Sequence, residues 1–115
     1  MTLSKQASRL RNNSATWAIV INANIDAGQH WFSEPTMKFF NSRLIGNPVH
    51  TPLDSRVYYF VSSERMALSD EFPSSYTVRS INTDTGEVSD VSEFQEYPSA
   101  SKAKAAMIFV AGKVA

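Results

Sequence analysis

The sequence of 115 residues contains no cysteine and only four glycines. Without cysteine the chain has no disulfide, no thiolate nucleophile and no cysteine-ligated zinc site. It contains neither G-x-x-x-x-G-K-[ST] nor G-x-G-x-x-G, so no phosphate-binding loop is indicated. No apolar run reaches the length of about 18 residues that a transmembrane helix needs, so we expect no membrane span. Basic and acidic residues number 11 each, which leaves no overall field to attract nucleic acid or an anionic membrane.

No set of polar residues in the chain predicts catalysis. His30 and His50 lie far apart on different loops, without a third ligand near them, so we expect no metal site. The serines lack a nucleophile motif such as G-x-S-x-G. Glu64, Asp70 and Glu71 offer carboxylates for acid–base work, but their place in a polar loop favours a solvated surface. The sequence therefore predicts a non-enzymatic protein without a cofactor.

The length and the hydrophobic content of 43% predict one folded domain, which we place at residues 15–115. Residues 1–14 contain three basic residues, no acidic residue and many polar ones, and this composition favours a mobile basic arm. The arm and the apolar run 15–23 together loosely resemble a signal peptide. That run is short, however, and its alternation is better suited to a strand.

Periodicity along the chain predicts the element order β-α-β-β-β-α. Alternation at 16–25 indicates a half-buried strand, and Ser33 is a suitable N-cap for a helix that includes 36–44. Gly46-Asn47-Pro48 is expected to end this helix before a loop at 49–55. Further elements are expected as strands at 56–63, 76–82 and 87–97 and as a helix at 99–114. The fold class is therefore α+β, with an antiparallel three- to four-stranded sheet and two helices packed mainly on one face.

Two of the expected elements have irregular patterns. Alternation slips within 87–97, and a β-bulge near Asp90 would explain this. In the last helix Ile108 and Phe109 widen the apolar stripe beyond one face, which predicts a homodimer through these two residues. A terminal strand at 108–111 is the alternative for that segment.

Several short motifs occur in a fixed order between residues 30 and 107. They are Trp31-Phe32-Ser33, Thr36-Met37-Lys38-Phe39-Phe40-Asn41-Ser42-Arg43, Tyr59-Phe60-Val61-Ser62-Ser63-Glu64, Tyr76-Thr77-Val78-Arg79, Thr85-Gly86 and Glu93-Phe94-Gln95. The set resembles a small uncharacterised protein family that is found mainly in bacteriophages and prophages. The resemblance implies a phage or mobile-element origin. It implies no activity, because none is established for that family.

Basic residues leave nucleic-acid binding open as a function. The elements expected from residue 36 onward follow the order of double-stranded RNA-binding domains, in which lysines at the start of the last helix contact phosphates. Lys102 and Lys104 hold that position, and Arg79 and Arg43 would add to the positive charge. The loop 64–75 would enter the minor groove, but it contains three acids and one arginine, which oppose contact with phosphates.

The lack of a catalytic set and the family resemblance together favour a protein that acts by binding. We expect a phage or mobile-element accessory protein, cytoplasmic in the infected or lysogenic host, that docks on a host protein of a defence or replication pathway. Trp31 is a candidate interface anchor, although its place at a strand–helix junction also suits packing. Nucleic-acid binding through Lys102, Lys104, Arg79 and the basic arm is the first alternative. Binding or sequestering of a small ligand is the second, and it requires a pocket with convergent polar groups.

Overall fold

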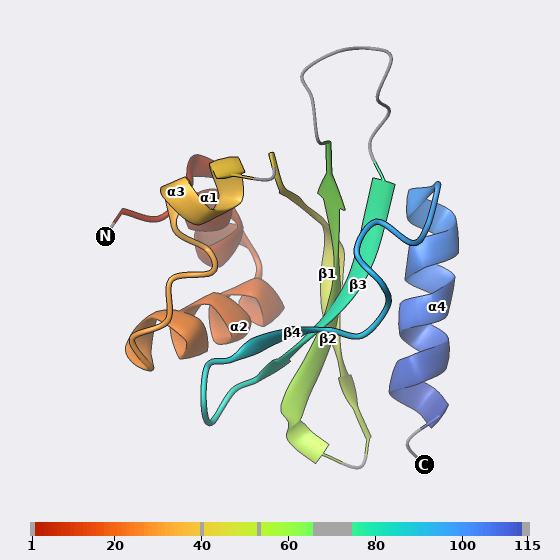
Figure 1. Ribbon diagram of the computed structural model, residues 1–115. Coiled ribbons are helices and arrows are strands. Elements are labelled where there is room, and N and C mark those ends of the chain that lie inside the picture. The colour runs from red at the N-terminus through yellow and green to blue at the C-terminus, as the bar shows by residue number, and fades with distance from the viewer. Residues whose placement is uncertain (1, 40, 53, 66–74, 114–115) are drawn as a thin grey trace.

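One antiparallel sheet forms the middle layer of the structure, and helices lie on both of its faces (Figure 1). The computed structural model describes residues 2–39, 41–52, 54–65 and 75–113. Helices α1 (Lys5–Asn13), α2 (Ala15–Asp26) and α3 (Glu34–Phe39) lie on one side of the sheet, and α4 (Ala100–Lys113) lies on the other. The α+β class and the antiparallel sheet that the sequence predicts are confirmed.

The four strands form a meander in the order β1-β2-β3-β4. Their bounds are Arg43–Thr51 for β1, Asp54–Glu64 for β2, Ser75–Asn82 for β3 and Val88–Asp90 for β4. β2 and β3 pair without interruption from Val57 opposite Asn82 to Glu64 opposite Ser75. The pairing of β1 with β2 shifts between Ile45 and Val49, where Gly46 has a φ of 66°. A glycine permits this bulge because it adopts positive φ without steric cost.

Alternate side chains of the sheet enter two separate cores. The core on the side of α1, α2 and α3 contains Ala7, Trp17, Val20, Ile21, Phe32, Met37, Leu44, Phe60 and Ile81. The core on the side of α4 contains Val61, Val78, Ala103 and Met107. Successive residues of a strand point to opposite faces, so β2 gives Phe60 to the first core and Val61 to the second. This explains the run of apolar residues on both faces of the predicted strand 56–63, which is confirmed as part of β2.

The strand predicted at 16–25 is wrong, because this segment belongs to helix α2. The Ser14 side chain caps the helix by accepting a hydrogen bond from the Trp17 N–H. The buried residues of α2 follow helical spacing and are Trp17, Val20, Ile21 and Asn24. Ile19, which alternation places with Trp17 and Ile21, is instead 46% exposed. A short apolar run fits both the helical and the strand periodicity, and packing against the sheet selects the helix.

The segment 1–14, for which the sequence predicts a mobile basic arm, contains helix α1. The Ser4 hydroxyl caps this helix by accepting a hydrogen bond from the Ala7 N–H at 3.1 Å. Ala7 is completely buried, and Leu10 packs against the same core. The Ser4 N–H also donates to the Phe32 carbonyl at 3.2 Å. In place of the expected arm, apolar side chains of this segment, Leu3, Ala7 and Leu10, pack a short helix against the core.

The helix predicted over 36–44 is shorter than expected, because α3 ends at Phe39. Asn41 follows with a φ of 49°, and β1 begins at Arg43. Gly46-Asn47-Pro48 therefore lies within the bulge of β1, and the loop expected at 49–55 is replaced by the end of β1 and the start of β2. The expectation of two helices on one face is also wrong. Val61 and Val78 form an apolar patch on the opposite face, and α4 covers it.

The later elements of the structure agree better with those predicted from the sequence. The strand expected at 76–82 and the helix expected at 99–114 are confirmed as β3 and α4 over their described residues. Ser99 caps α4, since its hydroxyl accepts a hydrogen bond from the Lys102 N–H at 3.3 Å. The strand expected at 87–97 is reduced to β4, which ends at Asp90. The next two N–H groups both donate to the Val78 carbonyl, at 2.8 and 3.2 Å, which is the geometry of the bulge expected there.

Candidate functional site

A buried ion network joins β2, β3 and β4. Arg79 of β3 donates through Nη2 to Glu64 Oε1 at 2.9 Å and through Nε to the Ser62 hydroxyl at 2.7 Å. Its Nη1 donates to Asp90 Oδ1. The side chains of Arg79 and Glu64 are 7% and 0% exposed, whereas that of Asp90 is 46% exposed. The network therefore runs from a completely buried carboxylate to one at the surface.

The network has more acidic than basic groups. Two carboxylates face one guanidinium, so its formal charge is negative. The Thr77 hydroxyl also donates to Glu64 Oε1, at 2.8 Å. Glu64 Oε2 is buried and has no hydrogen-bond partner among the described residues. Charges in a low-dielectric interior interact strongly, so the pairing of Glu64 with Arg79 is needed to keep either group buried.

A pocket of about 280 Å³ lies beside this network. It is lined by Trp31, Thr36, Met37, Ser42, Arg79, Asp90 and Phe94. The guanidinium carbon of Arg79 lies 5.0 Å from the centre of the Trp31 ring and 6.0 Å from that of Phe94. Both distances permit cation–π attraction, which adds to the ion pairs that fix Arg79. We call this cavity the Arg79 pocket.

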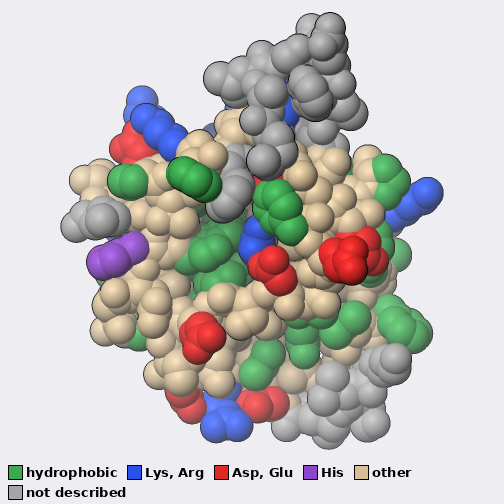
Figure 2. Space-filling model, viewed as in Figure 1, with side chains coloured by type: hydrophobic (Ala, Val, Ile, Leu, Met, Phe, Trp, Pro, Cys, Tyr) green, Lys and Arg blue, Asp and Glu red, His purple; other side chains and the backbone are tan. Residues whose placement is uncertain are grey.

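The surface around β4 is acidic and partly apolar. No lysine or arginine occurs from residue 80 to residue 101, whereas this segment contains Asp84, Glu87, Asp90, Glu93 and Glu96. Val91 and Phe94 are each 37% exposed among these carboxylates. Figure 2 shows acidic side chains across the middle of this side of the molecule, with hydrophobic ones between them. We call the surface of residues 87–97 the β4 face.

Tyr97 ends the β4 face and ties it to the sheet. Its backbone exchanges two hydrogen bonds with Tyr76, at 2.8 and 3.0 Å. Burial raises the pKa of the Tyr97 hydroxyl, and the hydrogen bond and negative charge of Glu96 raise it further. The Gln95 N–H donates to the Thr77 hydroxyl at 2.8 Å, so the loop is attached directly to the ion network.

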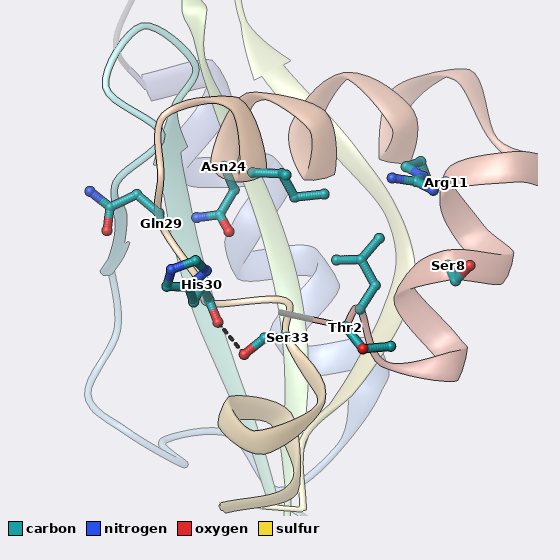
Figure 3. Close-up of a pocket in the computed structure, with 9 residues that line it drawn as sticks. Thr2, Ser8, Arg11, Asn24, Gln29, His30 and Ser33 are labelled. Carbon is teal, nitrogen blue, oxygen red and sulfur yellow. Dashed lines mark hydrogen bonds between the residues drawn. The ribbon is translucent and has the colours of Figure 1, made fainter.

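A second and larger pocket, of about 400 Å³, lies between α1, the end of α2 and the loop that follows α2 (Figure 3). Ser8 and Arg11 reach it from α1, Asn24 from α2 and His30 from the loop. Asn24 is held in place, because its Nδ2 donates to the Gly86 carbonyl at 2.7 Å and its Oδ1 accepts from the Trp31 N–H at 3.2 Å. We call this cavity the Arg11 pocket.

The candidate interaction residues from the sequence do not come together in space. Lys102 and Lys104 are exposed on α4, on the opposite face of the sheet from Arg79, which is buried and paired. Arg43 is exposed at the start of β1. Trp31 is half-buried, and its ring centre lies 5.0 Å from that of Phe32 and 5.5 Å from that of Phe60. Only Trp31 and Arg79 share a site.

The outer side of α4 keeps its apolar side chains at the surface. Ile108 and Phe109 are 60% and 66% exposed, whereas Ala103 and Met107 face the sheet. A homodimer through Ile108 and Phe109 stays a prediction. None of the helices within the described residues is both long and apolar enough to span a membrane.

Glu64 corrects one expectation from the sequence. The sequence favours a solvated loop for this residue, but Glu64 is the last residue of β2 and is completely buried. Asp70 and Glu71 lie outside the described residues. His50 packs on Tyr58, with 5.4 Å between the ring centres. Within the described ranges, no three His, Asp or Glu side chains form a group that could hold a metal ion.

The model of one protein family matches residues 18–108, which include the ion network, the Arg79 pocket and the β4 face. Its description is a family of unknown function, DUF7447. The chain belongs to this family. Helix α1 and the residues before it lie outside the matched range, and with them four residues that line the Arg11 pocket, Thr2, Leu3, Ser8 and Arg11. No curated protein and no solved structure matches the chain.

The ion network of this DUF7447 protein has a signal in the sequence that could have revealed it. Ser62 and Glu64 on β2, and Thr77 and Arg79 on β3, are polar residues at alternate positions on the face that buries Phe60. The register places Ser62 opposite Thr77. Charges of opposite sign on inward positions of paired strands indicate a buried ion pair. The signal requires that the strand continue to Glu64, one residue beyond the predicted end.

Proposed function

We propose that this DUF7447 protein is a non-enzymatic accessory protein of a phage or mobile element that binds a host protein in the host cytoplasm. The observation that supports binding best is the β4 face, where exposed Val91 and Phe94 lie among carboxylates and no basic residue interrupts them. The resemblance of the motifs to a phage and prophage family supports the origin.

The composition of the β4 face is that of a protein-binding surface. Interfaces combine a small apolar centre with a polar rim, and complementary charges accelerate association. Val91 and Phe94 supply the apolar part, and Glu87, Glu93 and Glu96 supply the rim. A partner of matching chemistry presents apolar side chains surrounded by lysine or arginine. The same carboxylates repel phosphate groups, so this face does not favour nucleic acid.

The Arg79 pocket supplies an anchor point at the edge of the β4 face. Asp90 uses Oδ1 to accept from Arg79 and is 46% exposed, so its carboxylate is accessible to a second donor. The exposed carboxylate of Asp90 favours a cation there, and the rings of Trp31 and Phe94 favour one that can also stack. A partner arginine or lysine that enters this pocket would therefore be a hot spot of the interface.

Affinity capture with matched variants tests the proposal. The tagged protein, Glu93→Lys, Val91→Ser and the control Asp26→Lys are each incubated with lysate of the bacterial host, and retained proteins are quantified by mass spectrometry. Glu93 and Asp26 are both exposed, so the two reversals change the charge equally, but Asp26 lies at the end of α2. We expect one host protein that the wild type and Asp26→Lys retain and that both β4-face variants lose.

Titration of the purified partner completes this test. Glu93→Lys should weaken binding by about tenfold or more, mainly through slower association that is less sensitive to salt. Equal affinity of all four proteins, or no protein retained by the wild type, would show that the β4 face is not a docking surface.

A further inference from the structure

The Arg11 pocket has a charge opposite to that of the β4 face. Arg11 is the only acidic or basic residue of fixed charge that lines it, and the lining includes no carboxylate. No acidic residue occurs in the first 25 positions, while α1 also contains Lys5 and Arg9. The formal charge of the residues that line the pocket is therefore positive.

Arg11 is available to a ligand in the described structure. Its side chain is half-buried, and no ion pair or hydrogen bond joins its guanidinium to another described residue. Arg79, by contrast, is paired with the Glu64 carboxylate at 2.9 Å. Arg11 instead has five N–H donors and lines a cavity that lacks a protein acceptor of opposite charge. A guanidinium in this setting binds carboxylate or phosphate oxygens in two-pronged fashion.

The other residues that line the pocket form a polar side and an apolar side. Ser8 lies on the same helix as Arg11, and His30 lies across the pocket (Figure 3). Leu3 and Ile25 also line the cavity, and Ile25 is 36% exposed there. Ser33 is fixed by donating to the His30 carbonyl at 2.7 Å, which holds the loop against the pocket. The cavity thus offers a cationic end and an apolar side within about 400 Å³.

We propose that the Arg11 pocket binds a small organic anion, with its carboxylate or phosphate group on Arg11 and its apolar part against Leu3 and Ile25. The site is independent of the proposed protein interface, because the Arg11 and Arg79 pockets share no lining residue. Hydroxyl and imidazole groups of Ser8 and His30 supply further hydrogen bonds to the ligand.

Titrations followed by amide NMR spectra test the site with four probes of similar shape. Phenyl phosphate and benzoate are the two anionic probes, and they distinguish a phosphate site from a carboxylate site. Phenol is the neutral control, and phenyltrimethylammonium is the cationic control. We expect one of the anions to cause saturable shifts at the amides of Ser8, Arg11, Ile25 and His30, and we expect neither control to do so at equal concentration.

Variants on α1 decide whether Arg11 binds the anion. Arg11→Gln should weaken binding by about tenfold, because it removes a charge-assisted hydrogen bond. Arg11→Lys should recover part of that loss. Arg9→Gln, an exposed position of the same helix outside the lining, should leave binding unchanged. Thermal unfolding of each variant confirms that the helix is retained.

Three outcomes would overturn the proposal. The first is that neither anion shows saturable shifts with the wild type. The second is that phenol binds as tightly as the better anion. The third is that Arg9→Gln weakens binding as much as Arg11→Gln, which would indicate only a diffuse attraction of the basic helix for anions.

Discussion

Replacement of Arg79 by methionine should destabilise this protein more than any other single change in the ion network. Methionine fills a similar volume but has no donors, so Glu64 loses its only charged partner while it stays 0% exposed. One hydrogen bond, from the Thr77 hydroxyl, would remain on its carboxylate. Breaking a buried ion pair by removal of one partner costs about 3–5 kcal/mol. This is a large share of the stability of about 5–15 kcal/mol that is typical of a domain.

Urea unfolding monitored by circular dichroism measures this loss, since a single domain of this size usually unfolds in one cooperative step. With m values of about 1–3 kcal/mol/M, the expected loss moves the midpoint down by at least about 1 M. Asp90→Asn is the internal comparison. Its side chain is 46% exposed, so water replaces the lost interaction, and the cost should be only about 1 kcal/mol.

The double variant Arg79→Met with Glu64→Met separates charge from packing. If the cost of Arg79→Met arises from an uncompensated carboxylate, removal of that carboxylate should restore most of the lost stability. The double variant should then lie within about 2 kcal/mol of the wild type. The reasoning is refuted if Arg79→Met costs less than about 1 kcal/mol, or if the double variant is as unstable as the sum of the two single changes.

Two further predictions concern the backbone and pH. Gly86→Ala should cost at least about 2 kcal/mol in urea unfolding, because φ is 71° and a Cβ would lie 2.6 Å from that of Ala27. Gly28→Ala should cost only about 1 kcal/mol, since its φ is 79° but nothing lies within 4 Å; equal losses would contradict this account. The hydrogen bond from the Arg56 side chain lowers the pKa of Asp54 below 3.8. The interaction of Asp54 with Arg56 therefore stabilises the protein above this pH, and the stabilisation is lost as the pH falls through the lowered pKa. The stability of Asp54→Asn should then differ from that of the wild type at neutral pH and match it in strong acid.

The sequence alone predicts those elements in which the hydrophobic periodicity and the terminal residues indicate the same secondary structure. The helix α4 follows from an apolar stripe at helical spacing, although the sequence also permits a terminal strand at 108–111. β2 and β3 follow from aromatic and β-branched residues. Strand β1 is absent from the sequence-based prediction, because Gly46-Asn47-Pro48 is a typical stop for a helix. Here the same residues bulge out of a strand that β2 holds in place on both sides of the shift.

The first half of the chain was mispredicted for a different reason. In α2 the side chains of Trp17 and Ile21 are buried in either a strand or a helix, so alternation alone does not decide between them. Packing against the sheet decides, and a hydrogen bond of 2.7 Å from Trp17 Nε1 to the Gly46 carbonyl attaches the helix to the bulge of β1. Such a contact between residues far apart in sequence has no local signal. The candidate site was missed because Glu64 shares the inward face of Phe60 only if β2 continues one residue beyond its predicted end.

Equal numbers of acidic and basic residues leave no overall field to attract nucleic acid or an anionic membrane, but the arrangement of these residues separates the two signs of charge. The first 25 residues contain only basic charges, and residues 80–101 contain only acidic ones. α1 and the β4 face therefore have potentials of opposite sign within one neutral molecule. A neutral total does not weaken either local field, because screening confines each to a distance of about 8–10 Å at moderate salt. Under the two proposals above, these faces would select ligands of opposite charge, a basic protein surface at β4 and a small anion beside α1.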